Sequence, residues 1–345
     1  MRQFLLLFLF LGLVFSLSSC QRQAPPEALH LGGETMGTTW SVTVHPDNSK
    51  ANAPALQSLL QGRLNAINHL MSTYDPESEV ARFNKLQSDA WFPISVDTYL
   101  VISRAQKISA LTGGAFDISV GPLVELWGFG PPERQQHIPT EEQIKQLLSR
   151  IGYHNLEIKA HPAAIRKLIP DLHIDLSAIA KGYAVDALAK LLREQGYNNF
   201  LVEVGGELQI SGRRDDGGPW RIAIEKPVED VREVQTIFPL TDTAVATSGN
   251  YRNFYVENGQ HYAHTIDPVS GRPARHKLAS ATILDADCAR ADALATAMMV
   301  MGEDRGRKFC EDNDIPAYFL IHEGTGLTSY ASPAFQRFTE KIKHD

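Results

Sequence analysis

The sequence predicts an α+β fold, in which helices flank a sheet of mixed or antiparallel strands. Apolar residues recur at helical spacing mainly in the first half of the chain, whereas alternating strand patterns concentrate between residues 200 and 266. Strands and helices do not alternate regularly, which argues against a doubly wound parallel sheet. The 345 residues are 43% apolar and 21% charged, which excludes disordered, collagen-like and disulfide-scaffold proteins.

The charge balance argues against a nucleic-acid partner. The chain has 33 Lys and Arg residues against 40 Asp and Glu residues, a net charge of −7. Acidic surfaces repel phosphate backbones, and the basic residues are interleaved with acids throughout. We therefore expect no nucleic acid among the partners.

The first residues resemble a bacterial lipoprotein signal. An apolar run over residues 4–17 follows Arg2, and it is shorter than the roughly 18 residues of a membrane-spanning helix. The run ends at Leu17-Ser18-Ser19-Cys20, which is similar to a lipobox. We expect residues 1–19 to be cleaved and Cys20 to carry lipid, holding the protein on the periplasmic side of a bacterial membrane, inner or outer. The alternative is an ordinary secretory signal with an incidental cysteine.

The rest of the chain is expected to be a tether at 20–32 followed by one domain at 33–345. Within the domain, Thr140 and Gln143 form a capping-box pattern at a helix start. The expected helices cover 56–71, 96–111, 140–152, 181–195 and 289–301, and the expected strands cover 34–44, 173–176, 200–204, 207–211, 221–225, 280–284 and 317–321, with a hairpin around 258–259.

Several familiar motifs are incomplete or absent. The glycines at 128–130 lack the rest of a dinucleotide fingerprint, and there is no P-loop pattern. Ser177 and Lys181 are spaced as SxxxK, whereas penicillin-binding enzymes need SxxK. No HExxH or CxxC pattern indicates zinc. Cys288 and Cys310 lie in predicted helices, as buried thiols or as a disulfide.

One pair of polar residues stands out in the predicted helix at 289–301. Asp292 and Thr296 are four residues apart, so they share one face of an otherwise small and apolar stretch. Such groups are costly on a packed face unless they are satisfied. Mg²⁺ would satisfy both, because it prefers oxygen ligands. The alternative, which the spacing alone favours, is that Asp292 merely caps or hydrogen-bonds a neighbouring strand.

A predicted strand-to-helix junction at 174–183 offers a second candidate site. Its unpaired backbone groups, with Asp175 and Lys181, are suited to a phosphate or a metal. Helix capping by Asp175 or Ser177 is the alternative. His264 ends a predicted strand before a turn, a place where a single histidine is usually structural.

Taken together, these segments resemble the ApbE family of periplasmic FAD:protein FMN transferases. They follow the family's order behind a lipobox and cover nearly the whole mature chain. The matching motifs are MGTTW at 36–40, MSTY at 71–74, SEVARFN at 78–84, GGAFD at 113–117, VGP at 120–122, DLSAIAKGY at 175–183, VGG at 204–206, SGNY at 248–251, HTIDPVSGRP at 264–273 and ADALATAMMVMG at 291–302.

The resemblance implies an α+β fold with a flavin cleft between two lobes. It also implies a Mg²⁺ ion held by Asp292, Thr296 and the Ala178 carbonyl, with His264 near the pyrophosphate of FAD. The residues implied to contact FAD are Met36, Tyr74, Ala115, Phe116, Asp117, Asp175, Lys181 and Ile266.

The reaction implied is transfer of FMN from FAD to a threonine hydroxyl of a target protein, with release of AMP. His264 or a nearby carboxylate would take the hydroxyl proton. The implied targets are flavin-bearing subunits of sodium-pumping NADH:quinone reductase or Rnf-type complexes. Two alternatives stay open: hydrolysis of FAD to FMN and AMP, and a lipoprotein that binds FAD without turnover.

Overall fold

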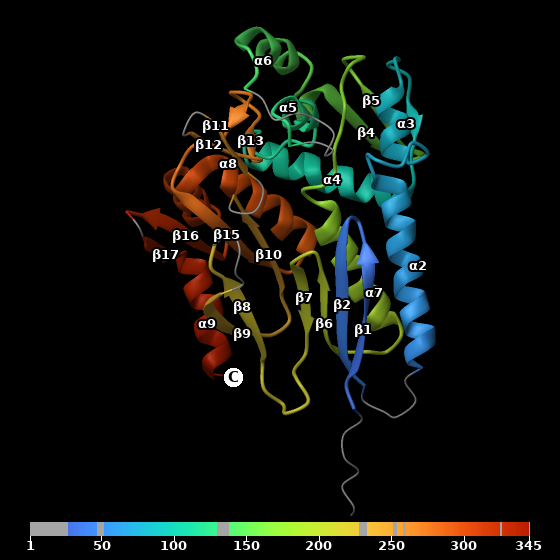
Figure 1. The fold of residues 1–345 in the computed structure, drawn as a ribbon. Coiled ribbons are helices and arrows are strands. Elements are labelled where there is room, and N and C mark those ends of the chain that lie inside the picture. Colours follow the sequence, from blue (N-terminus) through green and yellow to red (C-terminus); the bar gives the residue numbers. More distant parts are fainter. Residues whose placement is uncertain are drawn as a thin grey trace, which may run out of the picture.

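An eight-stranded antiparallel sheet forms the centre of the computed structural model (Figure 1). The structure describes residues 27–46, 52–129, 138–227, 233–250, 254–257, 260–324 and 326–344. Within the sheet the strand order is β1-β2-β6-β7-β10-β15-β16-β17. These strands are β1 (Leu29–Thr35), β2 (Thr38–His45), β6 (Asn199–Val204), β7 (Glu207–Ser211), β10 (Ala244–Gly249), β15 (Leu278–Asp285), β16 (Ala317–Glu323) and β17 (Gly326–Ala331).

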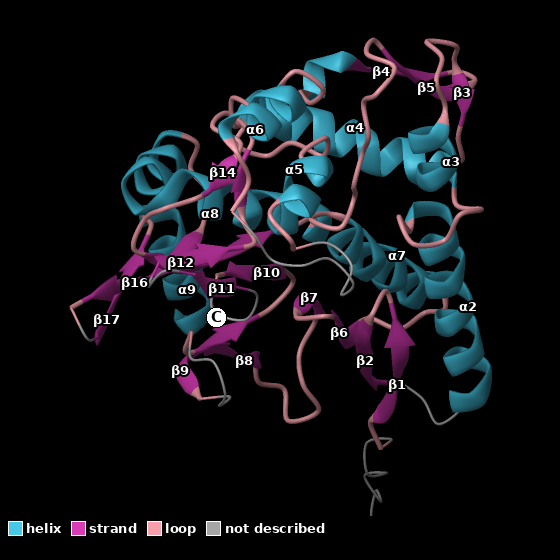
Figure 2. Ribbon diagram, turned by 45° about the horizontal axis from the view of Figure 1, so that its top comes forward, coloured by secondary structure: helices cyan, strands magenta, loops and turns pink. Residues whose placement is uncertain are grey.

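Helices and four small sheets surround the central sheet, with α4, α5 and α6 gathered at one end of it (Figure 2). The helices are α2 (Ala53–Met71), α3 (Glu79–Lys85), α4 (Val96–Leu111), α5 (Gly121–Leu126), α6 (Glu141–Leu148), α7 (Ala180–Glu194), α8 (Cys288–Asp312) and α9 (Pro333–His344), with a 3₁₀ turn at Tyr153–Asn155. The small sheets pair β3 (Phe92–Pro93) and β4 (Leu156–Ala160) with β5 (Ala163–Lys167), β8 (Trp220–Glu225) with β9 (Val234–Leu240), β11 (Phe254–Glu257) with β12 (Gln260–Ala263), and β13 (Ile266–Asp267) with β14 (Arg272–Pro273).

Alternation along the central strands divides the interior into two cores. Ala246 and Ile283 pack with α7 and α8, whereas their neighbours Val245 and Leu284 join a second core with β8, β9 and α9. Successive side chains of a strand point to opposite faces, so both faces of this sheet are covered. The sheet therefore holds α7 and α8 side by side on one face, where the candidate site residues lie.

The predicted strand at 34–44 is a hairpin. β1 and β2 pair through a tight turn at Met36 and Gly37, whose φ angles are 49° and 71°. The alternating pattern was visible only in the second arm, because Gly32 and Gly33 carry no side chain in the first. β1 begins at Leu29, so the tether expected over 20–32 is wrong for its last residues.

The predicted strand at 173–176 is also wrong. The Asn84 side chain binds both backbone groups of Ile174, accepting from its N–H (2.8 Å) and donating to its carbonyl (2.9 Å). An amide side chain thus takes the place of a neighbouring strand. The predicted helix at 289–301 continues to Asp312 as α8, although Gly302 breaks its backbone with φ 76°. β11 and β12 confirm the predicted hairpin, but its turn at 258–259 lies outside the described residues.

The remaining expected helices and strands are confirmed within a few residues, and the capping box of Thr140 and Gln143 is formed as predicted. Cys288 and Cys310 are both buried free thiols, which resolves that alternative. Over the described residues, no helix has both the length and the apolar character needed to cross a bilayer.

Lys167 on β5 carries an unusual buried ammonium group. Its side chain is fully buried, and its Nζ donates to the Asn84 carbonyl at 3.3 Å and lies 4.7 Å from the centre of the Phe83 ring. Burial lowers the pKa of Lys167 to about 8. Between this value and the ordinary pKa of about 10.4, the unfolded chain binds the extra proton, so stability rises with pH across that window.

We expect Lys167→Met to have a higher free energy of unfolding than the unchanged protein. The difference between the two should be largest below pH 8. The advantage should shrink by about 3 kcal/mol as the pH rises to about 10.5, because the lysine is then neutral in both the folded and the unfolded chain. Urea unfolding of both proteins across this range measures the difference. A constant difference would show that Lys167 keeps its ordinary pKa.

Candidate functional site

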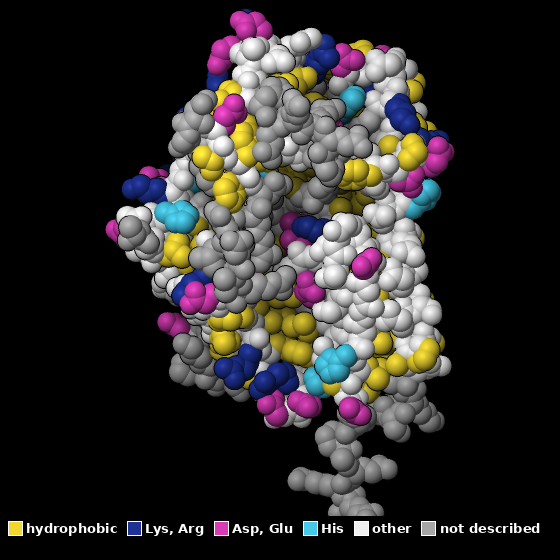
Figure 3. Space-filling model, in the orientation of Figure 1, with side chains coloured by type: hydrophobic (Ala, Val, Ile, Leu, Met, Phe, Trp, Pro, Cys, Tyr) yellow, Lys and Arg dark blue, Asp and Glu magenta, His cyan; other side chains and the backbone are white. Residues whose placement is uncertain are grey.

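A cavity of about 440 Å³ opens between the central sheet with its helices and the layer that contains α5 and β13. Figure 3 shows a hollow near the centre of the face of the molecule that is turned toward the viewer, with charged side chains of both signs inside it. Six separate segments line the cavity. They are residues 115–124, the junction at 175–181, the β6–β7 turn at 205–207, the end of β10 at 247–249, the segment at 264–268 and α8 between 292 and 300.

The structure brings ten of the predicted site residues to this one cavity. They are Ala115, Phe116, Asp117, Asp175, Ala178, Lys181, His264, Ile266, Asp292 and Thr296. Two others lie elsewhere. Met36 lies in the β1–β2 turn beside a separate hollow of about 530 Å³, and Tyr74 follows α2 with 73% of its surface exposed. Cys20 lies outside the described residues.

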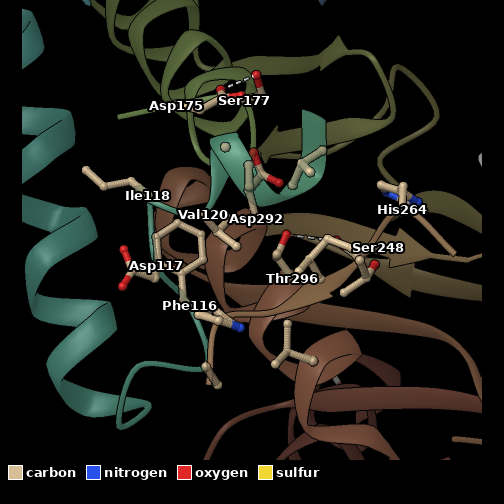
Figure 4. A pocket seen from close by; sticks show the side chains of 18 of the residues that line it. Phe116, Asp117, Ile118, Val120, Asp175, Ser177, Ser248, His264, Asp292 and Thr296 are labelled. Carbon is tan, nitrogen blue, oxygen red and sulfur yellow. Dashed lines mark hydrogen bonds between the residues drawn. The ribbon is translucent and has the colours of Figure 1, made fainter. Parts of the chain in front are cut away.

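Asp292 and Thr296 lie on the same face of α8 and both border the cavity (Figure 4). Asp292 is 3% exposed, and its Oδ2 accepts a hydrogen bond from the Gly182 N–H at 3.1 Å. The Thr296 hydroxyl lies 3.3 Å from the Ser248 hydroxyl. The alternative that Asp292 bonds to a strand is wrong, since Asp292 bonds to the first turn of α7. Thr296 is the residue that faces a strand, because Ser248 lies on β10.

The start of α7 supplies an oxygen beside this pair. An ordinary helix would send the Gly182 N–H to the carbonyl four residues earlier, that of Ala178, but this N–H donates to Asp292 instead. Among the described residues, no backbone N–H donates to the Ala178 carbonyl. A carboxylate, a hydroxyl and a carbonyl without a backbone donor therefore belong to residues that line one cavity, and this all-oxygen set fits Mg²⁺.

The described residues hold no cluster of three or more His, Cys, Asp or Glu side chains with metal-binding geometry. Mg²⁺ commonly takes only one or two protein carboxylates and completes its shell with water and substrate phosphates. The donor set of Asp292, Thr296 and Ala178 is consistent with that pattern.

Lys181 lies between two buried carboxylates. Its Nζ is 2.9 Å from Glu207 Oε1 and 3.9 Å from Asp292 Oδ2. Burial raises the pKa of Glu207 to about 8, against the attraction of Lys181. Burial likewise raises the pKa of Asp292, whereas the two carboxylates outweigh the effect of burial on Lys181 and raise its pKa. Two acids thus share one ammonium group, and a bound cation would favour the ionised form of both.

Asp175 and Asp117 both accept hydrogen bonds from backbone N–H groups close to them in the fold. Asp175 Oδ1 accepts from the N–H of Ser177 at 2.8 Å and from its hydroxyl, which forms a turn ahead of α7. No side chain caps the start of α7 itself, so the capping alternative at this junction is wrong. Asp117 accepts from the Ser119 N–H and from the Tyr153 N–H, each at 2.8 Å. In Figure 4 the Asp117 carboxylate is turned away from Asp292 and Thr296. Its carboxylate therefore shapes the loop that presents Phe116.

His264 approaches the cavity from the side opposite Asp117 in Figure 4. Its ring meets Phe129 edge-on, with 6.4 Å between the ring centres. The sequence analysis assigned no role to two further lining residues, Glu207 and Ser248, although Ser248 begins the SGNY motif. Each has its partner in the site far along the chain, so no local spacing signals either of them.

Comparisons with known proteins match most of this chain. The model of the ApbE family matches residues 36–319. A Vibrio cholerae protein named FAD:protein FMN transferase is 43% identical over 94% of this chain and 96% of its own length. An Escherichia coli K12 protein of the same name is 36% identical over 94% of this chain and 95% of its own.

Two solved structures show the same fold. The flavin transferase ApbE from Vibrio cholerae has a TM-score of 0.83 and 44% identity, covering 91% of this chain and 100% of that one. The apo flavinyl transferase ApbE from Pseudomonas stutzeri has a TM-score of 0.84 and 36% identity, covering 91% and 97%. The resemblance and the predicted α+β class are thereby confirmed. The chain belongs to the ApbE family of enzymes.

Proposed function

We propose that this protein transfers the FMN part of FAD to a threonine hydroxyl of a target protein, with release of AMP, in a Mg²⁺-dependent reaction. The family and the names of the curated relatives support the flavin transferase class. The observation that carries the finer proposal is the oxygen set of Asp292, Thr296 and Ala178 in the same cavity as Lys181 and His264. Such a set suits a dinucleotide bound through its phosphates.

Each residue has a distinct task in this reaction. Asp292, Thr296 and the Ala178 carbonyl would hold Mg²⁺, which supplies neutralisation of the negative charge on the phosphates. The Lys181 ammonium attracts the same phosphates, and the apolar side chains of Phe116 and Ile266 provide surface for the rings of FAD. The α8 scaffold fixes Asp292 and Thr296 relative to each other.

The bond changes at the FMN-side phosphorus need no reactant other than FAD and the target threonine. The threonine oxygen forms a bond to this phosphorus, the bond to the phosphate of AMP breaks, and AMP leaves. We assign the hydroxyl proton to His264, which is the one histidine among the described lining residues. General base catalysis of this kind contributes about 10²–10⁴-fold.

Intact mass measurement tests the proposal. The purified protein is incubated with FAD, Mg²⁺ and a candidate target domain, such as a flavin-bearing subunit of a sodium-pumping NADH:quinone reductase or an Rnf-type complex. A target heavier by one FMN, together with free AMP, is the expected result. Free FMN and AMP with an unmodified target would support the FAD pyrophosphatase alternative instead. Intact FAD would support the non-catalytic flavin-binding alternative.

We also propose that the protein is anchored by lipid at Cys20 on the periplasmic side of a bacterial membrane, which suits a membrane-bound target. The support is the sequence pattern at 17–20. Cys20→Ala should remove fatty-acid labelling and release the protein from the membrane fraction. Its FMN transfer in solution should be unchanged, because the cavity is built from residues 115–300. Labelling that persists in the variant would overturn the anchor at Cys20.

A further inference from the structure

One carboxylate oxygen in the cavity has no partner. Glu207, at the start of β7, is 4% exposed and lines the cavity. Its Oε1 binds Lys181 at 2.9 Å, but its Oε2 is buried and has no hydrogen-bond partner among the described residues. Buried polar atoms are nearly always paired, so an unpaired carboxylate oxygen beside a cavity indicates a donor that arrives with the ligand.

The backbone beside this oxygen carries no side chain at position 205. Gly205 lies on the same wall with φ 61°, and a Cβ built there would lie 3.0 Å from Lys181 Cδ and 3.5 Å from Glu207 Oε2. This Cβ would also lie 2.9 Å from Thr38 Cγ2, so a side chain at position 205 would crowd both Lys181 and Glu207. Lys181 fixes the other oxygen, so the carboxylate is held in one orientation.

We propose that Glu207 is a specificity-determining residue, whose Oε2 accepts a hydrogen bond from an O–H or N–H group of the bound flavin dinucleotide while its Oε1 holds Lys181. The identity of the ligand rests on the proposed function. Flavin and adenine rings carry N–H donors, and the ribityl and ribose chains carry hydroxyl donors. The phosphate oxygens of the dinucleotide carry no hydrogen, so they cannot be the donor to Oε2.

The depth of Glu207 favours the dinucleotide over the acceptor protein. The acceptor threonine approaches a cavity that the dinucleotide already fills, so it reaches the mouth and not the wall behind Lys181. A side chain that is 96% buried is therefore contacted by the first ligand. Binding of FAD without any target protein should depend on Glu207.

Glu207→Gln tests this contact because it preserves the shape of the side chain. The amide oxygen is drawn to the Lys181 ammonium, so the NH₂ group faces the ligand donor and the hydrogen bond is lost. We expect the dissociation constant of FAD to rise by about 10- to 100-fold, the range for a hydrogen bond to a charged group. Glu194→Gln, on the exposed part of α7, is the matched control and should bind FAD normally.

Titrations of the variant with FMN and with ADP identify which half of FAD carries the donor. A loss confined to FMN places the donor on the flavin or ribityl group, and a loss confined to ADP places it on the adenosine. Circular dichroism checks that Glu207→Gln is folded. Unchanged affinity for FAD would overturn the proposal. If the unaltered protein does not bind FAD at all, the proposed function fails instead, so the two failures are distinguishable.

A double-mutant cycle separates direct contact from an effect through Lys181. The cycle uses Glu207→Leu, which has no acceptor oxygen in any orientation. If Glu207 acts only by holding the lysine, Glu207→Leu costs no further affinity in a Lys181→Met background, and the proposal is wrong. If Oε2 binds the dinucleotide, Glu207→Leu still costs 10-fold or more in that background. The same cycle measured with riboflavin, which has no phosphate, removes the contribution of Lys181 to phosphate binding.

Discussion

Replacing Asp292 with alanine should lower Mg²⁺-dependent FMN transfer by more than about 100-fold, while FAD binding without metal changes little. Residues that merely orient metal ligands already cost 10- to 100-fold when they are replaced, so loss of the only carboxylate in the set should cost more. Asp292 also receives the Gly182 N–H, which ties α8 to α7. Initial rates of transfer across a range of Mg²⁺ concentrations measure the effect.

Asp304→Ala provides the control for Asp292→Ala. Asp304 is exposed on the same helix, beyond the break at Gly302, and does not line the cavity. Its removal changes the charge of α8 by the same amount and should leave the transfer rate unaltered. Normal Mg²⁺-dependent turnover in the Asp292→Ala variant would show that the metal is held elsewhere.

Gly182→Ala should lower the free energy of unfolding by about 2 kcal/mol, although alanine favours helices. A Cβ at this position in the first turn of α7 would lie 2.5 Å from the Cys288 carbonyl oxygen and 2.7 Å from the Ala289 Cα. Backbone atoms cannot relieve a close contact by changing rotamer, as a side chain can, so α7 and α8 must move apart. The Gly182 bond to Asp292 should lengthen, and FMN transfer should fall together with stability. Urea unfolding and transfer rates measure the two effects.

Gly62→Ala is the matched control for this substitution. Gly62 lies within α2, and a Cβ there would meet nothing within 4 Å. The helix preference for alanine then acts alone, so we expect a gain of about 0.5–1 kcal/mol. If both alanine variants gained stability equally, the close approach of α7 to α8 would be wrong.

Patterns that lie within one segment could be predicted from the sequence. The α4 helix, the capping box of α6 and the pair Asp292 and Thr296 each depend on residues a few positions apart. The hairpin of β1 and β2 was missed in part because Gly32 and Gly33 erase the alternation of its first arm. The chain at Ile174 was taken for a strand because its apolar side chain is buried, while Asn84, 90 positions away, satisfies its backbone.

In the candidate site, too, local patterns could be predicted from the sequence, whereas contacts between distant segments could not. Spacing alone did not decide between a metal site and a simple hydrogen bond at Asp292, because the freed Ala178 carbonyl arises only when α7 meets α8. Glu207 gave no signal, since its pairing with Lys181 requires β7 to lie beside α7. The family resemblance supplied the grouping of residues that the local patterns lacked.

A crystal structure with FAD and Mn²⁺ in place of Mg²⁺ tests the central claim most directly, because anomalous scattering locates Mn²⁺. We expect one metal peak bounded by Asp292, Thr296 and the Ala178 carbonyl, with phosphate oxygens of FAD completing its shell. FAD bound with its phosphates away from these three residues, or a metal peak held by other groups, would contradict the proposed mechanism.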